Sequence, residues 1–138
     1  MNPNGRVEVD CVIEAAHADP DFGHLGFQHY LQYCDAGRRT LQEAYGVSNQ
    51  ALSTRGLGLV VRGFKDAVYR QEIVPGDRVT VRSRFLRYER GPLLQMRHEM
   101  VKDGRVAFAV STVHVFVDRA THRAVKPLDD LVSRLRGA

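Results

Sequence analysis

The stretch DPDFGHLGFQHY, residues 19–30, places acidic side chains and a histidine directly before a helix-like pattern. The first backbone N–H groups of a helix have no partner inside it, and they carry the positive end of the helix dipole. At this helix start, those groups belong to Gly26, Phe27 and Gln28. Such groups can stabilise an oxyanion, while Asp19 or Asp21 acts as a general base or a nucleophile.

The same residues also have structural interpretations. Asp-Pro-Asp is common in turns before helices, and His24 can serve as a hydrogen-bonding loop residue. Asp35 and Arg38 are spaced as an i, i+3 ion pair on one helix face. Core packing is the simpler role for Tyr30 and Tyr33, and His29 is more simply structural. The motif therefore needs its structural context before it is assigned to chemistry.

Two patterns flank this motif. From Val7 to Ala15 apolar residues alternate with acidic ones, which predicts a half-buried strand. The Asp/Pro/Gly-rich stretch 17–26 is a predicted loop. From Gln28 the apolar residues recur every three or four positions, which predicts an amphipathic helix that ends at Gly46. Gly37 lies on its apolar stripe, where a small residue lets a sheet approach closely.

The rest of the chain predicts a meander. Ser48 is a candidate cap for a short helix through Ser53. Strands are expected in 55–70 and 75–90, followed by two strands joined at Asp103-Gly104, a strong hairpin signal. A closing helix is expected from Pro127 to Leu135. One long helix and a meander bury their apolar faces when the sheet curls around the helix, so the predicted class is α+β.

The length, composition and charge of the chain limit the classes of protein to which it can belong. The 138 residues favour one domain, residues 1–138, and no stretch approaches a membrane span. The N-terminus lacks an apolar signal core, so a cytoplasmic protein with reduced Cys11 and Cys34 is expected. No metal-ligand spacing is present, so no metal is expected. The net charge is +4, and arginines cluster between Arg78 and Arg105. These arginines could bind a phosphorylated ligand or form the solvated face of a strand. The sequence contains no nucleic-acid-binding motif, so no nucleic-acid partner is expected.

The stretch DPDFGHLGFQHYLQYCDAGR resembles the opening motif of hotdog-fold acyl-CoA thioesterases of the 4-hydroxybenzoyl-CoA thioesterase type. The ordered segments GLVV, PGDRVTV and DGRVAFAVSTVHVFVD extend the resemblance over nearly the whole chain. The matching residues are Asp19, Asp21, Gly23, His24, Tyr30, Leu31, Asp35 and Arg38. The resemblance implies a hotdog fold, in which an antiparallel sheet of about five strands wraps around a long central helix.

The resemblance also implies an activity, which is hydrolysis of an acyl-CoA or acyl-carrier-protein thioester. The family's second aspartate stands three residues before the glycine, where this chain has Pro20, so the carboxylate role falls on Asp21, on Asp19, or on neither. The implied catalytic residues are Asp21, Asp19, His24, Gly26 and Phe27. Substrate contacts are expected from Leu25, Gln28, Tyr30, Asp35 and Arg38. Contacts to coenzyme A are expected from Arg82, Arg84, Arg87 and Arg90.

Coenzyme A enters this chemistry as part of the substrate, and no other cofactor is expected. A homodimer or homotetramer is expected, because a curled sheet leaves an unpaired edge strand that is usually covered. Two other functions stay open. One is a hotdog hydratase or dehydratase, although its histidine motif is not found in the sequence. The other is an acyl-thioester-binding protein without turnover.

Overall fold

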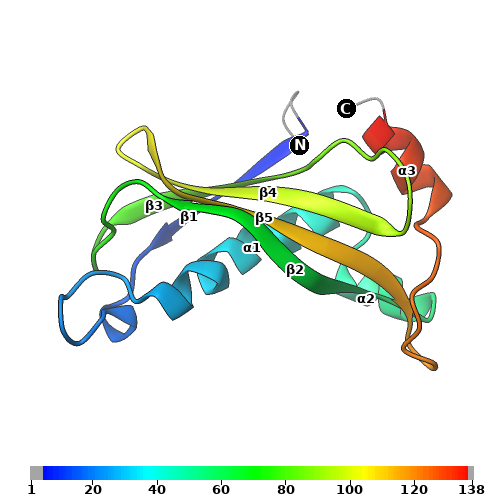
Figure 1. Ribbon diagram of the computed structural model, residues 1–138, viewed down its shortest axis with the longest axis horizontal. Helices are drawn as coiled ribbons and strands as arrows, with labels where there is room; N and C mark the ends of the chain where they lie inside the picture. The colour runs from blue at the N-terminus through cyan, green and yellow to red at the C-terminus, as the bar shows by residue number, and fades with distance from the viewer. Residues whose placement is uncertain (1–4, 137–138) are drawn as a thin grey trace.

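The computed structural model describes residues 5–136. A five-stranded antiparallel sheet holds one long helix against one face, which confirms the expected α+β class (Figure 1). The strand order is β1-β3-β4-β5-β2. The strands are β1 (Arg6–Val12), β2 (Leu57–Tyr69), β3 (Arg78–Phe85), β4 (Leu93–Lys102) and β5 (Arg105–Asp118). The helices are α1 (Tyr30–Ala44), α2 (Asn49–Thr54) and α3 (Asp129–Arg136), with single 3-10 turns η1 (Ala15–His17) and η2 (Phe27–His29).

Local signals account for most of these elements. The Ser48 hydroxyl accepts the Ala51 N–H at 3.1 Å and caps α2, as expected. Asp103 and Gly104 have φ values of 52° and 74°, the left-handed pair that a two-residue hairpin turn requires. The first strand is shorter than its alternation indicates. It ends at Val12, opposite Arg78, where β3 begins.

The sheet has two distinct faces. The inner face, which contacts α1, carries the alternate buried residues of β3, namely Val79, Val81, Ser83 and Phe85. Helix α1 packs mainly against β1, β3 and β4. One hydrophobic cluster centres on Leu41 and Phe116, and a second centres on Cys34 and Phe108. The outer face carries the intervening residues, because cross-strand partners share a face.

Gly37 is a point of close approach between α1 and the sheet. A Cβ built on Gly37 would lie 2.1 Å from Ser83 Oγ and 2.8 Å from Val81 Cγ1. A side chain larger than hydrogen therefore fits only if β3 moves or the side chains of Ser83 and Val81 shift. The expectation that a small residue here admits the sheet is therefore confirmed.

Strand β2 lies at one edge of the sheet and is poorly covered on its inner face. Val61, Phe64 and Tyr69 are 42%, 55% and 57% exposed, and their partners on β5 place all three on the inner face. Large apolar side chains on an unpaired edge strand are unusual in a protein that acts alone. Among the described helices, none is long and apolar enough to cross a membrane.

Candidate active site

The start of the long helix is formed by η2, which leads directly into α1. The Gly26 N–H donates to the His17 carbonyl at 2.9 Å, so it is already paired within the fold. The N–H groups of Phe27 and Gln28 have no acceptor among the described residues. No side chain caps this end of the helix. The structure thus leaves two of the three predicted N–H groups free at the helix start.

The loop before the helix is a short hairpin closed by a bridge between Ala18 and Leu25. Asp19 Oδ1 accepts the N–H groups of Asp21 and Phe22 at 2.8 and 3.1 Å. These backbone hydrogen bonds lower the pKa of the Asp19 carboxyl. Asp19 therefore shapes the turn, whereas the exposed side chain of Asp21 has no hydrogen-bond or ion-pair partner within residues 5–136.

Three of the predicted site residues contribute to the fold around this entrance. His24 Nδ1 donates to the Leu25 carbonyl at 2.9 Å. Leu25 is fully buried in the core, and Tyr30 packs its ring 4.7 Å from Phe108 and 5.0 Å from Tyr69. Phe27 and Gln28, in contrast, are exposed at the helix start. Of this group, the exposed pair is the one that is accessible to a substrate.

A Tyr–His pair that the sequence did not reveal supports the same region. The Tyr33 hydroxyl accepts the Glu14 N–H at 3.0 Å and is hydrogen-bonded to His17 Nδ1 at 2.6 Å. The His17 ring stacks on His29 at a centroid distance of 4.2 Å. These contacts tie the end of the β1 segment to the first turns of the helix, consistent with a structural role for His29.

A cavity of about 310 Å³ runs beside α1. Its walls come from α1, from the inner face of β2, and from β4 and β5. The lining residues are Leu31, Gln32, Cys34, Asp35, Arg38, Val61, Phe64, His98 and Thr112. Arg38 Nε donates to Asp35 Oδ1 at 2.7 Å, and Arg39 contacts the other carboxylate oxygen at 2.9 Å. The predicted Asp35–Arg38 pair is thus present and lines the cavity.

Cys34 is the thiol on the cavity wall. Burial raises the pKa of Cys34 to about 12. The thiolate is the nucleophilic form of cysteine, so this side chain stays protonated and unreactive at neutral pH. Both Cys11 and Cys34 are free thiols.

The floor of the cavity holds a polar chain that sequence reasoning missed. Ser83 Oγ lies 2.7 Å from His98 Nδ1, His98 Nε2 lies 2.9 Å from Thr112 Oγ1, and Thr112 Oγ1 lies 2.7 Å from His114 Nε2. Burial is the main cause that lowers the pKa of His98 to about 4 and that of His114 to about 3. Both imidazoles are therefore neutral at pH 7. The sequence signal that could have revealed them is the period-two alternation of β4 and β5, which places both histidines on the inner face of the sheet.

The four arginines predicted to meet coenzyme A do not form one group. Arg82 and Arg84 lie on the outer sheet face, where Arg82 approaches Glu8 at 3.7 Å. Arg87 and Arg90 lie between β3 and β4, at the end of the sheet near α3 and opposite the helix start (Figure 1). Their contact with coenzyme A stays a prediction from the sequence, and the function proposed below places the nucleotide at another basic group.

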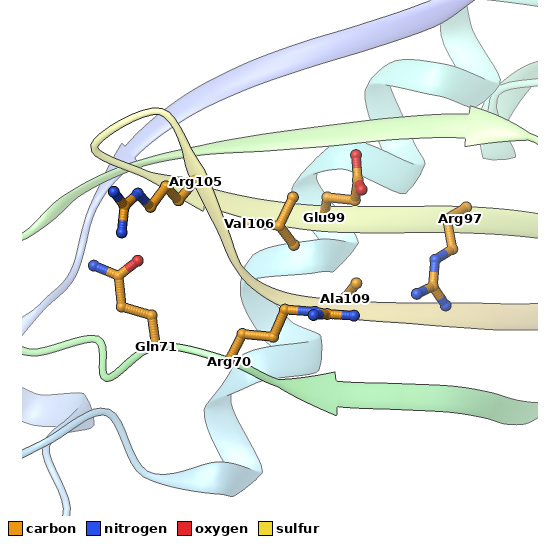
Figure 2. A pocket seen from close by; sticks show the side chains of 7 residues that line it. All are labelled: Arg70, Gln71, Arg97, Glu99, Arg105, Val106 and Ala109. Carbon is orange, nitrogen blue, oxygen red and sulfur yellow. The ribbon is translucent and has the colours of Figure 1, made fainter.

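A second basic hollow lies on the outer face of the sheet, because its residues Arg97 and Glu99 pair with Arg84 and Arg82 of β3, and it extends toward the end of the sheet where the helix starts (Figure 1). It has a volume of about 610 Å³ and is lined by Arg70, Gln71, Arg97, Glu99, Arg105, Val106 and Ala109. Figure 2 shows the three arginines around the hollow, each from a different segment of the chain. Arg97 Nη1 is held by the Asp66 carbonyl at 3.0 Å and by Ser111 Oγ at 3.1 Å. Sequence reasoning missed this group because strand pairing brings its arginines together from the end of β2, the middle of β4 and the start of β5.

Solved structures share this fold at low sequence identity. A DHNA-CoA thioesterase from Staphylococcus aureus is 17% identical, with a TM-score of 0.78 over 88% of this chain and 80% of that one. A 1,4-dihydroxy-2-naphthoyl-CoA thioesterase from Synechocystis is 14% identical, with a TM-score of 0.78 over 94% and 95% of the two chains. A probable thioesterase from Escherichia coli is 19% identical, with a TM-score of 0.76 over 94% and 96%.

No curated protein sequence matches the chain at a significant level. The family model of the thioesterase-like superfamily matches residues 9–135, which include the helix start, the cavity and the basic hollow. The fold seen in the solved structures agrees with that match. The chain belongs to the thioesterase-like superfamily and has the hotdog fold.

Proposed function

We propose that this protein hydrolyses an acyl-CoA thioester to a free acid and coenzyme A. The observation that supports this most is the pair of free N–H groups of Phe27 and Gln28 at the start of a long helix. The cavity beside α1 begins one helical turn further on, at Leu31. A thioester carbonyl held by these N–H groups would direct its acyl group along that cavity.

The chemistry follows from charge development. Attack on the carbonyl carbon places negative charge on its oxygen, and hydrogen-bond donors aimed at that oxygen contribute about 3–4 kcal/mol each in comparable sites. The C–S bond then breaks, and the thiol of coenzyme A leaves as a thiolate that needs no strong acid. Asp21 is the proposed base for the attacking water, because the Asp19 carboxylate is already held by two backbone N–H groups.

The basic hollow supports coenzyme A over a carrier protein as the thiol carrier. The Leu25 N–H donates to the Ile73 carbonyl at 2.7 Å, so the segment that follows Arg70 and Gln71 is bonded directly to the helix entrance. The flexible pantetheine arm would leave the helix start over this segment. The nucleotide phosphates would then reach Arg70, Arg97 and Arg105, whose guanidinium groups suit phosphate oxygens.

A second copy of the chain is also part of the proposal. The unpaired edge of β2 and the exposed Val61 and Phe64 beside the cavity are suited to pairing with the same strand of a partner. Such a pair would close the open side of the cavity. Light scattering is expected to show a dimer or tetramer, and a single species of 15.5 kDa at micromolar concentration would contradict this.

Thiol release from a panel of acyl-CoAs tests the proposed activity. We expect thiol and free acid to appear in equal amounts for at least one member. Binding without thiol release would favour the acyl-thioester-binding alternative. Addition of water to an enoyl-CoA would favour a hydratase.

A further inference from the structure

The cavity beside α1 has a polar far end. It extends along the helix from Leu31 to Arg38, and Gln28 precedes Asp35 by seven residues. At about 1.5 Å per residue, Asp35 lies about 10 Å along the helix from the free N–H groups. Leu31, Val61 and Phe64 provide apolar wall, whereas Thr112, His98 and the Asp35–Arg38 pair provide polar surface.

The hydrogens of the buried polar side chains Ser83, His98, Thr112 and His114 can be assigned one by one to find a donor that has no acceptor in the fold. Ser83 is fully buried, and among the described residues His98 Nδ1 is the hydrogen-bond partner of its hydroxyl. We therefore assign the Ser83 hydrogen to this contact, which leaves the N–H of neutral His98 on Nε2, facing Thr112. Buried N–H groups without partners are rarer than unpaired acceptors, so His114 also carries its hydrogen on Nε2 and donates to Thr112. His114 Nδ1 then remains an unpaired acceptor, in agreement with its lack of a hydrogen-bond partner among the described residues.

This arrangement gives Thr112 Oγ1 two donated hydrogen bonds and leaves its own hydrogen without an acceptor. A hydroxyl has one hydrogen to donate and two lone pairs, and here both lone pairs are occupied. Thr112 is 6% exposed and lines the cavity. Its O–H is therefore available to the cavity contents.

Arg38 supplies a second set of unused donors. Its Nε donates to Asp35 and its Nη1 to Gln42 Oε1 at 2.8 Å. Its Nη2 has no partner within the described part of the chain. Thr112 and Arg38 thus both present hydrogens, and the complementary group is an oxygen that accepts them.

We propose that this cavity selects an acyl group whose far end carries a hydrogen-bond-accepting oxygen, about 10 Å from the thioester carbonyl. The proposal rests on the thioesterase function proposed above. The apolar walls would hold a hydrocarbon body, and Thr112 and Arg38 would bind the distal oxygen. An acyl group without that oxygen would leave both donors buried and unpaired, which costs binding energy.

The dimensions define a suitable probe. A volume of 310 Å³ is at the small end of ligand cavities, so an acyl chain of medium length is the suitable probe. An extended chain advances about 1.2 Å per bond. The hydroxyl oxygen of an 8-hydroxyoctanoyl group therefore lies roughly 10 Å from the carbonyl carbon, which matches the position of the polar end.

The first test compares kcat/KM for octanoyl-CoA and 8-hydroxyoctanoyl-CoA by thiol release. We expect the hydroxylated thioester to be preferred by at least ~10-fold, as for a substrate that satisfies otherwise unpaired buried donors. Equal values, or a preference for octanoyl-CoA, would overturn the proposal. If neither thioester releases thiol, the proposed function fails, and calorimetric binding of the same pair still tests the selectivity.

Variants with matched controls identify the groups responsible. Thr112→Val removes the hydroxyl and should bring the ratio of the two kcat/KM values to within about 2-fold, whereas Thr112→Ser should retain it. Arg38→Leu should reduce the ratio, whereas Arg39→Leu should not, because Arg39 pairs with the same Asp35 but has a side chain that is 70% exposed. Unchanged ratios in both Thr112→Val and Arg38→Leu, with folded proteins confirmed by circular dichroism, would refute the assignment.

Discussion

Replacement of Gly37 by alanine tests the contact between α1 and the polar chain. The alanine Cβ would lie 2.1 Å from Ser83 Oγ, so β3 must move or Ser83 must rotate away from His98. Overpacking of this kind costs about 1–3 kcal/mol. Loss of the Ser83–His98 hydrogen bond adds about 1–3 kcal/mol because a buried ring nitrogen is left unpaired.

Helix propensity acts in the opposite direction. Alanine is favoured over glycine in a helix by about 1 kcal/mol. The net expectation is a destabilisation of about 1–5 kcal/mol. A value of about 3 kcal/mol, in the middle of this range, lowers the melting temperature of a chain of this size by about 10 °C. Thermal unfolding followed by circular dichroism provides the measurement.

Two controls separate the causes. Gly63→Ala adds a Cβ where no atom lies within 4 Å and should change stability little. Ala36→Gly, on the same helix but exposed, should lose only about the propensity difference of 1 kcal/mol. A Gly37→Ala protein as stable as the wild type, or more stable, would refute the close approach between helix and sheet.

Three further predictions concern catalysis, binding and pH. Asp21→Asn should lower kcat for the preferred acyl-CoA at least ~100-fold without unfolding the protein. The matched change Asp19→Asn should affect activity mainly by weakening the hydrogen bonds that hold the turn. Equal activities of Asp21→Asn and wild type would exclude Asp21 as the base. Arg105→Glu should raise KM for acyl-CoA with little change in kcat, and this effect should be smaller for a pantetheine thioester that lacks the nucleotide. Arg87→Glu, the control, should leave KM unchanged. A raised KM in Arg87→Glu and an unchanged KM in Arg105→Glu would place the nucleotide at the opposite end of the sheet. Burial holds the pKa values of His98 and His114 at about 4 and about 3, below the usual 6.5, so the unfolded chain binds more protons between about pH 3 and 6.5. Stability should therefore be fully present above pH 6.5 and fall as the pH is lowered, and calorimetry of His98→Asn should show a weaker decline.

The fold was largely accessible from the sequence because its signals are local. Alternation in 7–15, the helical period from Gln28 and the Asp103-Gly104 turn each depend on neighbouring residues. The end of β1 was placed too late because alternation continues past Val12, whereas pairing with β3 does not. Strand pairing across 70 residues leaves no local signal of where it stops.

The site was accessible only in part. The helix start, Asp35 and Arg38 lie on one continuous segment, so spacing alone brought them together. The hydrogen-bonded side chains from Ser83 to His114 come together only through the register of three strands, in which Ser83 pairs with His98. The pairing of the Gly26 N–H with His17 depends on how the loop folds back, which no periodicity describes.

The proposed activity depends above all on stabilisation of the oxyanion by free backbone N–H groups at the helix start. Phe27→Pro tests it directly, because Phe27 is the first helical residue, where proline is tolerated, and the preceding Gly26 is extended with ψ of 138°. Phe27→Ala is the matched control, since it removes the same ring but retains the N–H. We predict that kcat for thiol release falls at least ~100-fold in Phe27→Pro relative to Phe27→Ala, with similar melting temperatures. Equal kcat values in the two folded variants would contradict the claim.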